Sequence, residues 1–111
     1  MNIVKHTATN GSTTLTLTGD LDMATADLLD QHVTSTLTEA RPAGLVIDVT
    51  NLHFCDSTGV HALIRARRQA HQHGTTFQVT NPKGITRRTF QITGVLEVLT
   101  ARSGPRTVAG G

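Results

Sequence analysis

Leu45-Val46-Ile47-Asp48-Val49 is an apolar run broken only by Asp48. Such a run is typical of a central strand that is covered on at least one face, and in a domain that alternates strands and helices its neighbours are usually parallel strands. Residues 51–59 follow as Asn-Leu-His-Phe-Cys-Asp-Ser-Thr-Gly, and from Val60 the apolar residues recur at helical spacing. The stretch therefore predicts a buried strand that leads into a helix, the repeating unit of an α/β domain.

The residues before this stretch predict a hairpin followed by a helix. Leu15 and Leu17 alternate with threonines, as in a half-buried strand, and Asn10-Gly11 predicts a type I′ turn that joins this strand to a first one beginning near Asn2. Residues 19–22 end the second strand. From Met23 to about Glu39 the apolar residues change to the spacing of one helix face, with inward positions at Ala24, Leu28, Leu29, Val33 and Leu37.

The residues after the central stretch predict a second helix, a strand and a third helix. Gly74 is placed to close the helix that starts near Val60, residues 75–80 alternate as a strand, and residues 85–92 form a shorter helix. Residues 95–99 fit either an edge strand or a final helical turn. The predicted order is ββαβαβα, which indicates an α/β domain with a small, mixed and mostly parallel sheet and helices packed against it.

The composition describes one ordinary globular domain. The 111 residues are 37% hydrophobic, 16% charged and 3% aromatic, and because Trp and Tyr are absent the core must be aliphatic. We expect this domain to span residues 1–101, followed by a flexible C-terminal tail at residues 102–111, which has too few apolar groups to offset its ordering entropy. No apolar run approaches the roughly 18 residues of a membrane span, and the first residues lack the apolar stretch of a signal peptide, so we expect a cytoplasmic protein that does not bind membranes.

The start of the second helix is the most informative place for function. Asp56-Ser57-Thr58-Gly59 follows the buried strand directly, and the first N–H groups of a helix have no intrahelical partners. Together with the helix dipole, these groups stabilise an anion, including a phosphate on Ser57 or Thr58. A simpler interpretation makes one of the three polar residues only an N-cap. Gly59 costs up to about 1 kcal/mol inside a helix relative to Ala, which indicates that another surface approaches its backbone closely.

The same residues resemble a known family. Residues 46–59, with an apolar strand, Asp48 and Asp56-Ser57-Thr58-Gly59, resemble the signature of the STAS domain, and specifically of bacterial anti-sigma factor antagonists. Residues 17–22 resemble the early strand-to-helix segment of the family, and residues 87–95 resemble its third helix and the Thr-Gly turn after it. The resemblance covers roughly residues 15–99 in the right order and spacing.

The resemblance implies a phosphorylation switch in transcription regulation, as in bacterial stress responses. In this family the serine after the motif aspartate is phosphorylated by the partner anti-sigma factor, an ATP-dependent serine kinase. That residue is Ser57 here, with Thr58 as a secondary candidate. The unphosphorylated antagonist binds the anti-sigma factor and releases the sigma factor, phosphorylation ends this binding, and a PPM-type serine phosphatase restores it. No cofactor is implied, and the expected partner-binding residues are Asp20, Asp22, Asp56, Ser57, Thr58, Gly59, Val60 and His61.

A STAS-type adaptor or ligand-sensing domain that is never phosphorylated is the alternative. Many phosphorylated relatives have glycine where this sequence has His61. A bulky, titratable ring one turn from Ser57 could pair with a phosphate, narrow the choice of partner or block the usual kinase. The intact Asp56-Ser57-Thr58-Gly59 and the short length of the chain favour the phosphorylated switch.

Other chemistry finds little support in the sequence. His71 and His73 would face different sides of a helix, and no Cys, Asp or Glu joins them at a metal-site spacing, so we expect no metal site. The basic clusters at residues 65–68 and 83–88 lack interleaved aromatic residues, so we expect no nucleic-acid binding. Gly-x-Ser-x-Gly is absent and no oxyanion hole is implied, so we expect no enzymatic activity. Cys55, the only cysteine, excludes an internal disulfide and is expected to be a small buried side chain.

Overall fold

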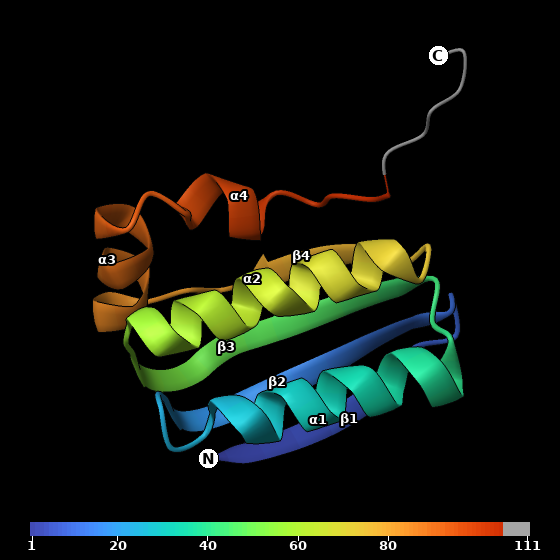
Figure 1. Ribbon diagram of the computed structural model, residues 1–111, viewed down its shortest axis with the longest axis horizontal. Helices are drawn as coiled ribbons and strands as arrows, with labels where there is room; N and C mark the ends of the chain where they lie inside the picture. Colours follow the sequence, from blue (N-terminus) through green and yellow to red (C-terminus); the bar gives the residue numbers. More distant parts are fainter. Residues whose placement is uncertain (106–111) are drawn as a thin grey trace.

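The computed structural model describes residues 1–105 (Figure 1), and residues 106–111 of the expected tail lie outside the described part. The strands and helices follow the predicted order, with one more short helix at the end. The elements are β1 (Asn2–Thr7), β2 (Ser12–Leu21), α1 (Ala26–Ser35), the π-helical turn η1 (Thr36–Ala40), β3 (Gly44–Cys55), α2 (Ser57–Gln72), β4 (Thr76–Thr80), α3 (Gly84–Ile92) and α4 (Leu96–Thr100).

Four strands form one mixed sheet in the order β1-β2-β3-β4. β1 is antiparallel to β2, whereas β3 pairs in parallel with β2 on one side and with β4 on the other. These pairs confirm that the apolar run at residues 45–49 is a central strand with parallel neighbours. β3 continues beyond that run to Cys55 and pairs there with Leu21 of β2. The carboxyl ends of these two strands therefore lie side by side.

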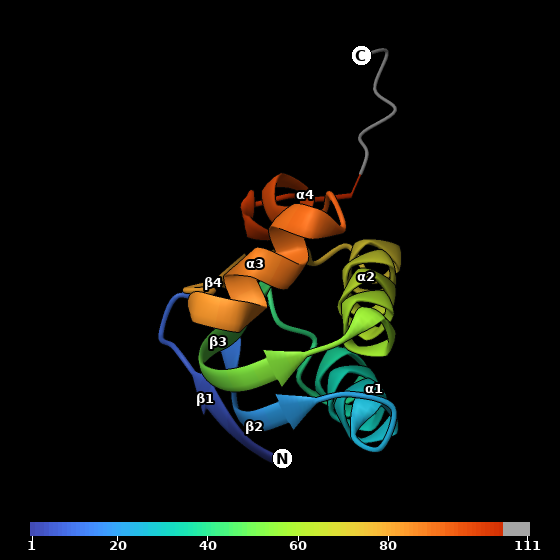
Figure 2. The ribbon, with the colours of Figure 1, turned by 90° about the vertical axis from the view of Figure 1, so that its left-hand side faces the viewer.

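Helices cover one face of the sheet. Figure 2 shows α1 and α2 next to each other on that face, with α3 and α4 close to the part of the sheet formed by β3 and β4. The core between sheet and helices is aliphatic, as the composition predicts, apart from Phe77 and Phe90. The opposite face of the sheet is polar, because half-buried residues such as Thr14, Thr16 and Asp48 alternate along the strands with buried Leu and Ile.

Two local predictions near the N-terminus are wrong. Asn10 lacks the positive φ that a type I′ turn requires, and Gly11 alone supplies it, at +90°. The connection between β1 and β2 is a four-residue turn, in which the Gly11 N–H donates to the Ala8 carbonyl at 3.2 Å. Ala24 is exposed rather than directed inward, because α1 begins only at Ala26.

The end of α2 follows the prediction. Gly74 has a φ of +73°, its N–H donates to the His71 carbonyl at 3.0 Å, and the Thr75 N–H donates to the Ala70 carbonyl at 2.9 Å. This pair of hydrogen bonds is the Schellman arrangement that a glycine after a helix makes available.

Residues 95–99, for which the sequence left two options, contribute to the helical turn α4. After that turn the chain returns to the sheet. The Ser103 N–H donates to the Phe77 carbonyl at 3.0 Å, and the Phe77 N–H donates to the Ser103 carbonyl at 2.7 Å. The first residues of the segment expected as a tail are therefore attached to β4.

Candidate functional site

Asp56 joins the end of β3 to the start of α2. Its backbone is extended (φ −96°, ψ −173°), and its carboxylate accepts a hydrogen bond from the Gly59 N–H at 2.9 Å. Its carbonyl accepts the first helical hydrogen bond, from the Val60 N–H, also at 2.9 Å. Asp56 is therefore the N-cap of α2, one of the three residues that the simpler interpretation of the motif allowed, and its carboxylate is occupied by its own helix.

Replacing this cap gives a first prediction. We expect Asp56→Ala to lower the free energy of unfolding by about 1 kcal/mol, because the Gly59 N–H loses its acceptor. Asp56→Asn retains a side-chain oxygen that can accept the bond and is expected to stay within about 0.5 kcal/mol of the wild type. Urea unfolding of the three proteins at neutral pH measures both differences. An equal decrease in the free energy of unfolding in the two variants would mean that the charge of Asp56, and not its hydrogen bond, stabilises the helix start.

Gly59 lies where α2 touches the end of β2. A Cβ at this position would lie 2.5 Å from the Leu21 carbonyl oxygen, 2.8 Å from Cys55 Sγ and 2.9 Å from Leu21 Cγ. The close approach inferred from the sequence therefore exists, but it is made by the domain itself. Gly59 is buried and does not offer its backbone to a partner, which corrects the expected role of this residue.

The accessible residues of the motif are Ser57, Thr58 and His61. Ser57 is exposed at the first position of α2, Thr58 is half-buried and His61 is exposed one turn further on. Val60 is only 3% exposed and belongs to the core, so it cannot contribute to a partner surface as the sequence analysis expected. The hydroxyl of Ser57 is the group of this motif that an enzyme can reach most directly.

The strand end at residues 20–21 lies beside this helix start. Asp20 and Leu21 pair with Phe54 and Cys55, and the Asp56 N–H donates to the Leu21 carbonyl at 3.3 Å. Asp20 itself is exposed. The structure thus places Asp20 close to the N-terminus of α2, at the carboxyl ends of adjacent parallel strands, where α/β sheets usually bind their ligands.

The side chain of Asp22 mainly stabilises the turn that leads into α1. Its carboxylate accepts hydrogen bonds from the Ala24 N–H at 3.0 Å and from the Thr25 hydroxyl at 3.2 Å, and its own N–H donates to the Thr25 hydroxyl at 3.0 Å. The side chain is half-buried. The hydrogen bonds of this carboxylate are made within the loop, and its part in partner binding stays a prediction.

Two exposed apolar side chains near the strand ends were missed by the sequence analysis. Phe54 is 41% exposed at the end of β3, and Met23 is 79% exposed in the loop after Leu21. For Phe54 the sequence did hold a signal, since neighbouring residues of a strand face opposite sides and Cys55 faces the core. Met23 lies in a turn, where no periodicity applies. Exposed large apolar groups beside a polar helix start suit a surface that binds another protein.

Cys55 is buried directly below the helix start. It is 1% exposed, and its burial, reinforced by the negative charge of Asp56, raises the pKa of the thiol to about 12. At neutral pH the side chain is therefore a thiol, not a nucleophilic thiolate.

This burial predicts the reactivity of Cys55. At pH 8 we expect iodoacetamide to alkylate the folded protein at least about 100-fold more slowly than the protein in guanidinium chloride. In the folded protein the thiol is almost entirely protonated, and the reagent cannot reach the sulfur. Intact-mass measurements along a time course give the two rates. Comparable rates would contradict the buried position of the thiol.

Asp48, part of the stretch that resembles the family signature, lies away from the helix start on the polar face of the sheet. Burial tends to raise its pKa, but hydrogen bonds from the Thr50 hydroxyl at 2.6 Å and N–H at 2.9 Å, together with Asn81 and the charge of Lys83, lower the pKa below its ordinary value. Asp48 therefore remains ionised at neutral pH, and its bonds to Thr50 lie where the register between β2 and β3 shifts.

Across residues 1–105, none of the helices is long and apolar enough to cross a membrane. In the same part of the chain, His, Cys, Asp and Glu side chains nowhere form a group of three that could hold a metal ion. His71 contacts the Ser103 hydroxyl and His73 contacts the Gln69 carbonyl, so these two imidazoles have different neighbours.

The family of the chain follows from a match over nearly its whole length. A model of the STAS domain matches residues 3–107. The chain belongs to the STAS domain family. The resemblance inferred from residues 15–99 is thereby confirmed, and the mixed sheet with Ser57 at the start of α2 is the STAS fold of this chain.

Solved structures of other proteins share this STAS fold. An anti-sigma factor antagonist from Mycobacterium paratuberculosis is 24% identical, with 98% of this chain and 88% of that chain covered and a TM-score of 0.77. The phosphorylated form of the Bacillus cell fate determinant SpoIIAA is 18% identical, with coverages of 98% and 95% and a TM-score of 0.65. A sulfate transporter family protein from Wolinella succinogenes is 20% identical, with coverages of 86% and 75% and a TM-score of 0.70. Because the fold occurs in such different proteins, function has to be argued from the site.

Proposed function

We propose that this STAS protein is an anti-sigma factor antagonist of the bacterial cytoplasm that is switched by phosphorylation of Ser57. In the unphosphorylated form it binds an anti-sigma factor that is an ATP-dependent serine kinase, and the sigma factor is released. Phosphorylation ends this binding, and a PPM-type serine phosphatase restores it. The chain acts by binding and not by catalysis.

The observation that carries this proposal is the position of the Ser57 hydroxyl. It is exposed at the first residue of α2, next to a cap that Asp56 already provides, so a kinase can reach it without local unfolding. Thr58, the secondary candidate, is half-buried and therefore a poorer acceptor. Asp20 and Met23, near the end of β2, and Phe54 and His61, on either side of Ser57 in the sequence, are also exposed and offer groups that a partner can contact.

A phosphate at this place would change the surface more than the fold. The first turn of a helix favours negative charge, so a dianion of about −1.5 to −2 charges on Ser57 can be accommodated by α2. Residues 20–23 and 54–61 include no Lys or Arg. A partner that covers this surface would have to desolvate the phosphate without a matched cation from this chain, which opposes binding.

The comparisons lend support to this proposal. The chain is similar to an anti-sigma factor antagonist, and SpoIIAA, with which it shares the fold, was solved in a phosphorylated form. The STAS fold therefore accepts phosphorylation in at least one protein of similar structure.

Co-purification from the native host tests the proposal. Tagged wild-type protein is expected to retain one serine-kinase anti-sigma factor, identified by mass spectrometry, whereas tagged Ser57→Asp is expected to lose it. Thr9→Asp is the matched control, because it adds the same charge in the turn between β1 and β2, at the other end of β2 from Leu21, and should retain the partner. Retention of the same partner by all three proteins, or of no anti-sigma factor by the wild type, would contradict the proposal.

The alternative is a STAS-type adaptor that is never phosphorylated, and His61 is the observation that favours it. The imidazole is exposed one turn after Ser57, on the same side of α2. Under this alternative, the protein would carry no phosphate in any growth condition and would bind its partner constitutively.

A further inference from the structure

A hollow of about 550 Å³ lies beside the carboxyl end of β4, where α4 packs on that strand next to α3 (Figure 1). Its volume is within the range of small-molecule sites, and α/β sheets usually bind ligands at the carboxyl ends of their strands. The end of β4, the loop after it, α3 and α4 each contribute residues to its lining, whereas residues 54–61 contribute none. The hollow is therefore separate from the surface around Ser57.

Two side chains of opposite charge line this hollow without pairing with each other. Arg87 comes from α3 and Glu97 from α4, and both side chains are exposed. The ion pair found within residues 1–105 joins two other residues, Arg65 and Asp30. A guanidinium group binds a carboxylate well, and a carboxylate accepts hydrogen bonds from an ammonium group. A ligand that carries both a carboxylate and an ammonium group would therefore supply a partner for Arg87 and for Glu97.

The edge of β4 adds two backbone groups to the same space. The Thr76 N–H donates to the Ala43 carbonyl at 3.1 Å, on the side of β3, whereas Phe77 exchanges its backbone hydrogen bonds with Ser103 on the opposite side. Peptide groups alternate in direction along a strand, so Val79 directs its N–H and carbonyl to the same side as Phe77. No turn or loop hydrogen bond within residues 1–105 reaches these two groups, and Val79 lines the hollow. They can therefore bind a ligand.

We propose that this hollow binds a free α-amino acid with an aliphatic side chain. The carboxylate of the ligand binds Arg87, its ammonium group binds Glu97, and its side chain packs against Leu96 and Pro82, which are half-buried in the lining. The free N–H and carbonyl of Val79 belong to one residue, so they match a ligand whose two charges are carried by one carbon atom. The proposal does not rest on the phosphorylation switch.

Titrations followed by amide chemical shifts test this site with three probes, leucine, N-acetylleucine and leucinamide. At about pH 6 the amino groups of leucine and leucinamide are both protonated. N-acetylleucine keeps the carboxylate but lacks the ammonium charge, and leucinamide keeps the ammonium charge but lacks the carboxylate. We expect each of these two probes to bind the wild type at least about fivefold more weakly than leucine does, because each loses one charged partner.

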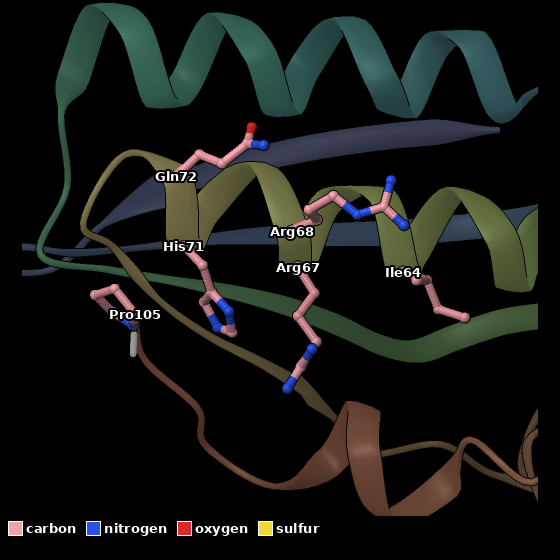
Figure 3. A pocket seen from close by; sticks show the side chains of 6 residues that line it. All are labelled: Ile64, Arg67, Arg68, His71, Gln72 and Pro105. Carbon is pink, nitrogen blue, oxygen red and sulfur yellow. The ribbon is translucent and has the colours of Figure 1, made fainter. Parts of the chain in front are cut away.

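Two variants assign each charge of the ligand to one residue. Arg87→Gln is expected to weaken binding of leucine at least about fivefold and to leave binding of leucinamide within about twofold of the wild type. Glu97→Gln is expected to weaken binding of leucine equally and to leave binding of N-acetylleucine within about twofold. Arg68→Gln is the matched control and should not change binding of leucine, because Arg68 does not line the hollow and points away from the segment that ends at Pro105 (Figure 3).

The location of the shifts is a readout of the wild-type protein alone. Leucine is expected to shift the amide signals of Val79, Arg87 and Glu97, and shifts confined to residues 57–60 would place the ligand at the start of α2 and overturn the proposal. Equal affinity for the three probes, an equal effect of Arg68→Gln and Arg87→Gln, or no saturable shift up to about 10 mM leucine would overturn it as well. Tighter binding of the dipeptide leucyl-leucine than of leucine would contradict a site for a free amino acid.

Discussion

Ser57→Asp is expected to weaken binding of the anti-sigma factor by more than tenfold, about 1.4 kcal/mol or more. The substitution puts a permanent negative charge on an exposed position whose neighbouring segments, residues 20–23 and 54–61, contain no Lys or Arg. Desolvating that charge in an interface is unfavourable unless the partner supplies a cation in the right place. Calorimetry with the purified partner measures the change in the dissociation constant.

The stability of the same variant separates a surface effect from a folding effect. A carboxylate in the first turn of α2 is favoured by the helix dipole, so the unfolding temperature of Ser57→Asp should change little. Ser57→Ala should bind the partner like the wild type and resist phosphorylation. Equal affinities for Ser57→Asp and the wild type would refute the switch, and continued stoichiometric labelling of Ser57→Ala would move the phosphorylation site to Thr58 or elsewhere.

Gly59→Ala is expected to destabilise the domain by about 2 to 3 kcal/mol. From the sequence alone the opposite sign would be predicted, since alanine is favoured over glycine inside a helix by up to about 1 kcal/mol. In the folded protein the added Cβ would lie 2.5 Å from a backbone oxygen, that of Leu21, which cannot rotate away like the end of a flexible side chain. α2 or the end of β2 would have to shift.

Urea unfolding measures this change, with Gly104→Ala as the control. A Cβ on Gly104 would meet its nearest neighbour, Thr76 Cγ2, at an ordinary 3.5 Å, so this variant should stay within about 0.5 kcal/mol of the wild type. A Gly59→Ala protein as stable as the wild type would show that α2 and β2 are not in the close contact described above.

Local sequence patterns were sufficient to predict most of the fold and the cap of α2. The parallel neighbours of β3 followed from its apolar run, broken only by Asp48, and an N-cap among residues 56–58 and the Gly74 turn followed from residue types with well-defined backbone preferences. These features depend on residues close together in the chain, so the sequence carries enough information about them.

The features that sequence reasoning missed depend on which distant segment lies opposite a residue. Gly59 was assigned to a partner because nothing in residues 56–61 shows that Leu21 already occupies the space in front of it. Val60 was placed in the partner surface for the same reason, although it faces the core.

Intact-mass spectrometry with site mapping, on protein isolated from its native host during growth and under stress, tests the central claim most directly. The switch predicts a fraction of molecules that carries one phosphate on Ser57, and a change of that fraction between the two conditions. Protein without phosphate in every condition, or with phosphate only on another residue, would contradict the switch and favour the constitutive adaptor, for which His61 would be the first residue to replace.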